Sequence, residues 1–207
     1  MELKALIFDV DGTLAETEEV HRQAFNETFA AQGLDWHWSK EDYRTLLHTT
    51  GGKERMVKQR EDLGSGPSDA QIADLHKAKP QRYVEIIASG QVSLLPGVAE
   101  LISRARSAGL RLAIATTTSR ANVEALIAAT LRKPAGEIFE VIAAGDDVAQ
   151  KKPAPDVYLL ALQGLGLPPA ACLAFEDSRP GLAAAKAAGM RVVLTPSEYT
   201  RGDDFSA

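Results

Sequence analysis

The sequence has little cysteine, no long apolar run and no secretion-type N-terminus, and each shortage excludes a class of protein. Its single cysteine, Cys172, excludes an internal disulfide and a multi-cysteine zinc site. No segment approaches the roughly 20 apolar residues of a membrane-spanning helix. The N-terminus enters the apolar segment 3–8 directly, without the layout of a signal peptide. We therefore expect a cytoplasmic protein with no membrane partner.

Clustered positive charge is also missing, and this argues against a nucleic-acid partner. The net charge is −5 and the chain contains no run rich in Lys and Arg, whereas phosphate backbones attract basic surfaces. Hydrophobic residues make up 45% of the 207 residues, which is enough to bury a core. These numbers predict one globular protein, and we expect a monomer.

The apolar pattern divides the chain into one strand, a helical insert and a regular strand–helix alternation. The segment from Glu16 to about Ala88 shows helical spacing, with a break expected at Pro80. Strands are predicted at 3–8, 110–115, 138–144, 172–175 and 190–194, and helices of the alternating part at 98–105, 122–129, 155–162 and 182–188. This order predicts an α/β fold with a doubly wound parallel sheet.

Polar residues follow the ends of four predicted strands. They are Asp9 and Asp11, the segment 116–119, Lys151 with Lys152, and Glu176 with Asp177. In open parallel sheets the ligand lies beyond the carboxyl ends of the strands, so these side chains are expected to share one site.

The first group, Asp9-Val10-Asp11-Gly12-Thr13, places two carboxylates two residues apart. They remain ionised only with a cation nearby; otherwise one takes up a proton, as a general acid or base does. The alternative is a simple turn, because Asp and Gly are common turn residues.

The other groups have the chemistry of a phosphate and metal site. Hydroxyls at 116–119 and the start of the next helix can cradle an anion, although Ser119 can equally be a plain helix cap. Lys152 can neutralise a phosphate oxygen or keep Asp9 ionised, whereas Lys151 is expected to be a solvated loop lysine. Carboxylates without nearby His or Cys suit Mg²⁺ rather than zinc.

Together these residues resemble the signature motifs of the haloacid dehalogenase superfamily. The matching positions are Asp9-x-Asp11-Gly12-Thr13, Thr116, Lys152 and Glu176-Asp177, in that order. The resemblance implies a Rossmann-like core at residues 1–14 and 89–207, with a helical C1 cap at 15–88. It also implies a further strand and helix after 192–194, whereas this sequence ends at Ala207; either the sheet edge is shorter or the chain is cut or divergent.

The same resemblance implies roles for the motif residues. Asp9 would be the nucleophile and Asp11 the acid and base, with Thr116 and Lys152 on the transferring phosphate. Asp9, the backbone carbonyl of Asp11 and Asp177 would hold Mg²⁺, with Glu176 at or just outside the ligand shell. The second aspartate is absent from the dehalogenase branch, so Asp11 favours phosphate chemistry.

A closer resemblance is to the CbbY-type phosphatases, which act on the 1-phosphate of xylulose-1,5-bisphosphate. It is carried by 15–18 with His21, by 50–55 and by 115–119 with Asn122. The candidate substrate contacts are Glu16, His21, Thr50, Gly51, Gly52, Lys53, Arg55, His76, Lys79, Thr117, Thr118, Ser119, Arg120 and Asn122. Gly51 and Gly52 would let the backbone approach a distal phosphate, with charge from Lys53 and Arg55.

Alternative interpretations remain for both the residues and the function. Glu16 and His21 fit a polar turn of the cap. His76, Lys77 and Lys79 are candidates for the distal phosphate but fit a solvated helix face equally well. Trp36 and Trp38 are expected to pack the cap. The competing functions are a phosphomutase resembling β-phosphoglucomutase, a phosphatase of another sugar phosphate, and a binding protein without turnover.

Overall fold

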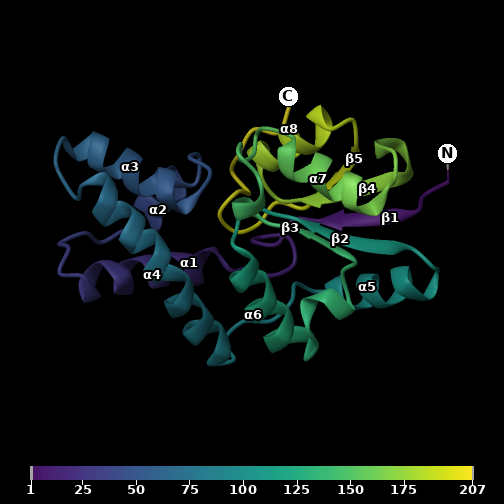
Figure 1. The fold of residues 1–207 in the computed structure, drawn as a ribbon, viewed down its shortest axis with the longest axis horizontal. Coiled ribbons are helices and arrows are strands. Elements are labelled where there is room, and N and C mark those ends of the chain that lie inside the picture. Colours follow the sequence, from purple (N-terminus) through teal and green to yellow (C-terminus); the bar gives the residue numbers. More distant parts are fainter. Residues whose placement is uncertain (1, 207) are drawn as a thin grey trace.

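The computed structural model describes residues 2–206 and shows two bodies side by side (Figure 1). One is a parallel five-stranded sheet in the order β3-β2-β1-β4-β5, which places the first strand at its centre. The strands are β1 Ala5–Phe8, β2 Arg111–Ala115, β3 Val141–Ala143, β4 Cys172–Glu176 and β5 Arg191–Leu194. The predicted parallel sheet is therefore confirmed.

Alternation along β1 explains why helices cover both faces of the sheet. Leu6 and Phe8 belong to an apolar cluster with α5 and α6, whereas Ala5 and Ile7 belong to one with α7 and α8. Figure 1 shows these two helix pairs on opposite sides of the strands. The helices are α5 Val98–Ser107, α6 Arg120–Leu131, α7 Asp156–Leu165 and α8 Arg179–Ala187. This is the doubly wound α/β class expected from the sequence.

The second body consists of four helices inserted after β1. They are α1 Glu18–Ala31, α2 Lys40–Leu46, α3 Gly52–Leu63 and α4 Asp69–Ala88. An aromatic cluster that includes Phe25, Phe29, Trp38 and Tyr43 fills its interior, with Trp36 packed against it, as predicted for the two tryptophans. We propose residues 15–88 as the cap domain, and 1–14 with 89–207 as the core domain.

The expected helix break at Pro80 is wrong, because α4 runs through it without interruption. Proline removes one backbone donor and disfavours a helix interior by about 3 kcal/mol. The buried side chains on both sides of Pro80, including Ile72, Leu75 and Tyr83, lie on one helix and outweigh this cost. The consequence is that His76 and Lys79 lie on one continuous helix of the cap.

The predicted strand at 138–144 is shorter in the structure and covers only Val141–Ala143. Ile138 follows a 3₁₀ turn, Ala135–Glu137, and Phe139 packs edge-on against Phe8 at 6.3 Å. Both residues are buried without pairing to β2. An apolar run cannot reveal which of its residues enter the sheet and which fill the core below it.

The chain after β5 returns over the carboxyl ends of the strands towards the cap. β5 forms an edge of the sheet and leaves Val193 37% exposed. Tyr199, five residues past the end of β5, is buried in the aromatic cluster of the cap. Within residues 2–206, no helix combines the length and apolar character needed to cross a bilayer.

Close packing between α8 and β4 gives a stability prediction. A Cβ on Gly181 would lie 1.9 Å from Glu176 Oε2, while one on Gly136 would have no neighbour within 4 Å. We expect Gly181→Ala to lower the melting temperature by roughly 3–10 °C, because forced overpacking costs about 1–3 kcal/mol. Gly136→Ala is the matched control and should melt like the wild type. Equal melting of all three proteins in calorimetry would contradict this packing.

Candidate active site

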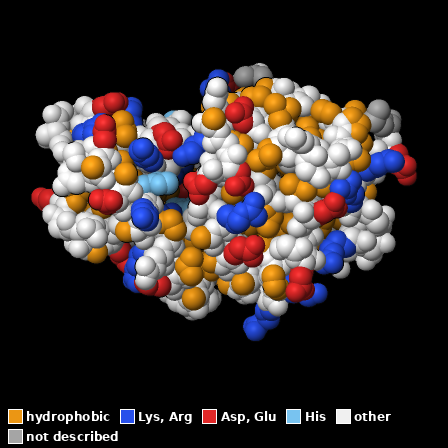
Figure 2. All heavy atoms as spheres, in the orientation of Figure 1, with side chains coloured by type: hydrophobic (Ala, Val, Ile, Leu, Met, Phe, Trp, Pro, Cys, Tyr) orange, Lys and Arg blue, Asp and Glu red, His pale blue; other side chains and the backbone are white. Residues whose placement is uncertain are grey.

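A cavity of about 480 Å³ lies between the carboxyl ends of the strands and the cap. Figure 2 shows this hollow between the two bodies, with Lys, Arg and His side chains gathered around it. The core contributes Asp9, Asp11, Lys152 and Asp177 to its wall. Its volume is within the range of roughly 300–1,000 Å³ that is usual for small-molecule sites.

A buried ion cluster forms the floor of the cavity. Lys152 Nζ donates to Asp9 Oδ1 at 2.6 Å, to Glu176 Oε1 at 2.6 Å and to the Ala115 carbonyl oxygen at 2.9 Å. The Tyr158 hydroxyl donates to the same Glu176 oxygen at 2.6 Å. Burial alone would lower the pKa of Lys152, but Asp9 and Glu176 raise it above the ordinary value. The lysine therefore stays charged.

The segment 9–13 is both a turn and part of the site, so the two sequence interpretations hold together. The amides of Thr13 and Leu14 donate to the Val10 carbonyl oxygen, at 3.2 and 2.9 Å. Gly12 has a φ of +80°, and a Cβ there would lie 2.3 Å from Asp177 Oδ2. Glycine is thus required by the turn and by the approach of Asp177.

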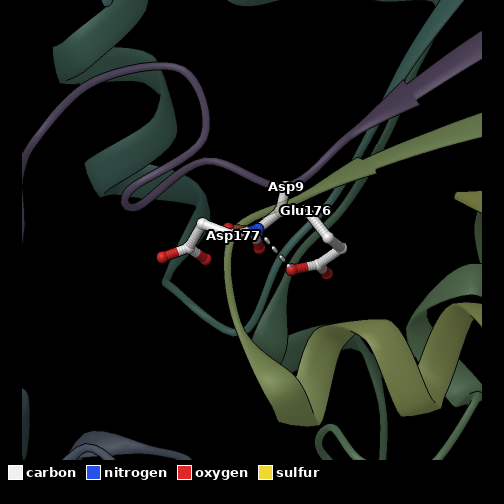
Figure 3. Close-up of side chains that lie close together, drawn as sticks. All are labelled: Asp9, Glu176 and Asp177. Carbon is white, nitrogen blue, oxygen red and sulfur yellow. Dashed lines mark hydrogen bonds between the residues drawn. The ribbon is translucent and has the colours of Figure 1, made fainter. Parts of the chain in front are cut away.

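Three buried carboxylates meet at this point, as Figure 3 shows: Asp9, Glu176 and Asp177, with one oxygen of each within 4.8 Å of the others. Burial raises the pKa of Asp9 to about 8, and Glu176 and Asp11 add to the rise against the opposing charge of Lys152. Burial and the charges of Asp9 and Glu176 raise the pKa of Asp177 too. A cation would relieve this repulsion, and an all-oxygen donor set fits Mg²⁺.

The carboxylate of Asp11 is not a member of this group, because it faces the cap. The Thr17 hydroxyl donates to Asp11 Oδ1 at 2.5 Å, and His21 Nε2 lies 2.9 Å from the same oxygen. Burial would raise the pKa of Asp11, but His21 and Thr17 outweigh it and hold the pKa below its ordinary value. Only the backbone carbonyl of Asp11 is left for the metal role that the resemblance implies.

Lys79 completes a row of polar groups behind Asp11. Its ammonium donates to His21 Nδ1, so His21 presents Nε2–H to Asp11. The ring of His21 is stacked on Tyr83 with centroids 4.4 Å apart, and Lys79 Nζ lies 4.8 Å from the Phe25 ring centroid. Lys79 is 5% exposed, which rules out the solvated helix face considered from the sequence.

The start of α6 forms one wall of the cavity. Asn122 Nδ2 donates to Thr118 Oγ1 at 2.9 Å, and the amide of Asn122 donates to Ser119 Oγ at 3.4 Å. Asn122 Oδ1 is buried and has no hydrogen-bond partner among residues 2–206. The predicted contacts from this segment that line the cavity are Thr117, Thr118, Ser119, Arg120 and Asn122. Thr116 is 1% exposed and lies behind them, where its hydroxyl accepts from the Thr118 amide at 3.2 Å.

The opposite wall comes from the cap, where α3 begins at Gly52. Gly51 adopts a φ of +104°, which turns the chain into the helix. The Arg55 guanidinium is held by the Thr49 carbonyl oxygen and the Tyr43 hydroxyl, both at 3.0 Å. The predicted contacts from the cap that line the cavity are His21, Thr50, Gly51, Gly52, Arg55, His76 and Lys79. The N-termini of α3 and α6 therefore both lie at the cavity, which favours an anion there.

Three expectations from the sequence are corrected here. Glu16 is outside the cavity wall and accepts from the Glu198 amide at 3.0 Å. Lys53 is exposed and is not among the residues of the cavity wall. Lys151 is not a solvated lysine: it is 19% exposed and donates to both carboxylate oxygens of Glu54 at 3.0 Å.

Other residues at the site were not among the site residues predicted from the sequence. They are Thr17 and Tyr158, which hold Asp11 and Glu176, and Arg44, His48, Tyr199 and Thr200, which line the cavity. Thr17 could have been considered from its place just before the first cap helix. Tyr158 has no local signal, since it lies 18 residues from Glu176 on another element.

Comparison with models of known protein families identifies the family of this chain. It matches the model of the haloacid dehalogenase-like hydrolases over residues 3–189. The chain belongs to this family and is a hydrolase by membership, in agreement with the motif residues gathered at the strand ends.

Within the family, the chain is similar to proteins named CbbY. It is 89% identical to Protein CbbY of Rhodobacter capsulatus, over all of this chain and 91% of that protein. A crystal structure of CbbY from Rhodobacter sphaeroides in complex with phosphate is 56% identical, with a TM-score of 0.96. The match covers 99% of this chain and 91% of that chain. A mutant of that protein, crystallised with xylulose-(1,5)bisphosphate, matches with the same values. The predicted resemblance and fold class are thereby confirmed.

The buried Lys79 gives a prediction for pH dependence. Burial lowers its pKa to about 7 from 10.5, against the opposing effects of Asp11 and Glu18. Between these values the unfolded chain binds more protons at this residue than the folded chain, so its effect on stability grows more favourable as pH rises. We expect the free energy of unfolding of the wild type, relative to Lys79→Met, to increase between pH 7 and pH 9.

Urea unfolding of both metal-free proteins measures this difference, which has an upper limit of about 1.4 kcal/mol per pH unit. Lys77→Met, at the neighbouring exposed lysine of α4, is the control and should follow the wild type at both pH values. If the difference in free energy of unfolding between the wild type and Lys79→Met stays constant from pH 7 to pH 9, the pKa of Lys79 is not lowered by folding.

Proposed function

We propose that this hydrolase is a Mg²⁺-dependent phosphatase that removes the 1-phosphate of xylulose-1,5-bisphosphate through an aspartyl-phosphate on Asp9. The observation that carries the proposal is a single cavity with two regions suited to anions. One is the floor, where Lys152 lies beside Asp9; the other lies between the N-termini of α3 and α6. The complex of the Rhodobacter sphaeroides relative with this bisphosphate supports the choice of sugar.

In the first step a carboxylate oxygen of Asp9 attacks the phosphorus in line and the bond to the sugar oxygen breaks. Lys152 stabilises charge on the transferring group, because it is buried, charged and 2.6 Å from Asp9. Thr116 acts from behind the wall by fixing the amide of Thr118. The nucleophile is unprotonated only when cations offset the burial that raises its pKa to about 8.

Asp11 exchanges the protons of both steps. In the first it gives a proton to the departing sugar oxygen. The Lys79 ammonium can replace that proton through His21, which takes up a proton at Nδ1 and passes one from Nε2 to Asp11, 2.9 Å away. In the second it takes a proton from the water that attacks the aspartyl-phosphate, which releases phosphate and restores Asp9. The lowered pKa of Asp11 keeps its carboxylate ionised, which the second step requires.

Asp9, Asp177 and the backbone carbonyl of Asp11 are the proposed Mg²⁺ ligands, with Glu176 just outside because Lys152 and Tyr158 already occupy one of its oxygens. When bound, Mg²⁺ supplies positive charge to the transferring phosphate and offsets the repulsion between carboxylates. The side-chain oxygen of Asn122, Oδ1, can accept a hydrogen bond from a sugar hydroxyl.

We assign the distal phosphate to the region between the two helix N-termini. Ser119 and Arg120 start α6, and Gly51 and Gly52 start α3. Arg55 adds a half-buried positive charge on the cap side. Arg120, which lines the cavity and pairs with Asp147, is the proposed cation on the core side.

Phosphate release from a panel of sugars tests the proposal. The panel contains xylulose-1,5-bisphosphate, ribulose-1,5-bisphosphate, fructose-1,6-bisphosphate and β-glucose-1-phosphate, each with Mg²⁺, and compares kcat/KM. We expect the first sugar to be preferred by at least about tenfold, the equivalent of 1.4 kcal/mol. Flat activity would mean a different sugar phosphate, and isomerisation of glucose-1-phosphate without phosphate release would mean a phosphomutase.

Asp9→Asn should abolish hydrolysis while leaving the fold intact, because the amide lacks the nucleophilic carboxylate. Circular dichroism checks the fold, and a stopped assay of phosphate release checks turnover. Sustained turnover by this variant would remove Asp9 from its role as nucleophile.

Arg120→Ala and Lys53→Ala separate the two candidate cations for the distal phosphate. We expect Arg120→Ala to raise KM for the bisphosphate by about tenfold, the scale of one charge-assisted hydrogen bond. The KM for a monophosphate analogue should change far less. Lys53→Ala is the matched control and should stay within about twofold of the wild type. The reverse order of effects would assign the distal phosphate to Lys53.

A further inference from the structure

The segment after β5 contacts the metal-site carboxylate Asp177 directly. Thr200 Oγ1 lies 2.7 Å from the Asp177 carbonyl oxygen and 3.3 Å from its Oδ2. The same hydroxyl accepts from the Ser197 amide at 2.9 Å, and the Ser197 side chain also hydrogen-bonds the Asp177 carboxylate. Within residues 2–206, the hydrogen bonds found on this carboxylate come from Ser197 and Thr200.

The preceding residue, Tyr199, points the other way and is inserted into the cap. It is 6% exposed and belongs to the aromatic cluster of the cap, with its ring 6.0 Å from that of Tyr43. Its hydroxyl donates to Glu19 Oε2 at 2.7 Å, and the Arg44 guanidinium lies 5.6 Å from its ring centroid. A residue of the core chain is therefore a packed member of the cap.

Two neighbouring residues thus connect the cap to a carboxylate at the floor of the site. Consecutive Cα atoms are about 3.8 Å apart, so a shift of Tyr199 with the cap is passed to Thr200. We propose that Thr200 is a positioning residue for Asp177 and that Tyr199 links this position to the docking of the cap on the core. The inference rests on the proposed function, because it takes Asp177 as a metal ligand.

The first test measures Mg²⁺ binding by calorimetry with the metal alone, without substrate. We expect Thr200→Val to weaken binding by about tenfold, since it keeps the side-chain volume but removes the hydroxyl that holds the Asp177 carbonyl oxygen at 2.7 Å and lies 3.3 Å from its carboxylate. Thr200→Ser keeps the hydroxyl and should bind within about twofold of the wild type. Equal Mg²⁺ affinity of Thr200→Val and the wild type would overturn the positioning role.

Thr130→Val is the matched control for the loss of a hydroxyl. Thr130 lies on α6 and donates to the Leu126 carbonyl oxygen at 2.7 Å, away from the cavity wall. We expect its Mg²⁺ affinity to match the wild type. Should Thr200→Val fail to fold, Thr200→Ala is measured in its place under the same expectation, and rescue by Thr200→Ser distinguishes positioning from general destabilisation.

The second test addresses the link to the cap. Tyr199→Ala removes the ring from the cap cluster without touching Asp177, and we expect it to weaken Mg²⁺ binding by about fivefold and to raise KM for the sugar bisphosphate. Tyr199→Phe keeps the ring and loses only the bond to Glu19, so its effects should be smaller. Wild-type Mg²⁺ affinity in Tyr199→Ala would overturn the link, while leaving the phosphatase proposal unaffected.

Asp177→Asn separates failure of this inference from failure of the proposed function. It should abolish the binding signal and so assign that signal to this site. Full Mg²⁺ affinity in Asp177→Asn would refute the metal role of Asp177 and, with it, this inference. A wild type that binds Mg²⁺ here but releases no phosphate from the sugar panel would refute the substrate only.

Discussion

The buried ammonium of Lys152 is the interaction on which the rest of the site depends. It joins the ends of β1, β2 and β4 by contacting Asp9, the Ala115 carbonyl oxygen and Glu176. Without this positive charge, the carboxylates would stand together in a buried place where each disfavours ionisation of the others. The lysine offsets part of that repulsion, and what remains favours a metal ion.

Close backbone packing makes this charge cluster compact. Gly12 and Gly181 leave room for the carboxylates of Asp177 and Glu176, at distances where a Cβ would collide. Asp11 is separated from the cluster by facing Thr17 and His21, so two aspartates two residues apart have opposite pKa shifts. A nucleophile must be ionised and a general acid protonated, so the proposed chemistry needs a cation beside Asp9 and a proton supplied to Asp11.

The cap reaches the core by contacts on two sides of the cavity. Lys151 pairs with Glu54 on one side, and Tyr199 enters the aromatic cluster of the cap on the other. Neither contact was expected from the sequence, because each joins residues more than 90 positions apart. The cavity is thus shaped by long-range pairs that leave no periodic or spacing signal in the chain.

Local patterns determined the parallel sheet, the helical insert and the motif residues, since alternation, apolar runs and strand-end polar groups are properties of short segments. They also identified Asp9, Asp11, Lys152 and Asp177 as one site. Only the tertiary structure decided which cap residues face the cavity: it excluded Glu16 and Lys53 and buried Lys79. The physical reason is that the direction of a side chain is set by what its segment packs against. The helix α4 packs against α1 and α6, which lie far from it in the sequence, and Glu16 accepts a hydrogen bond from the amide of Glu198.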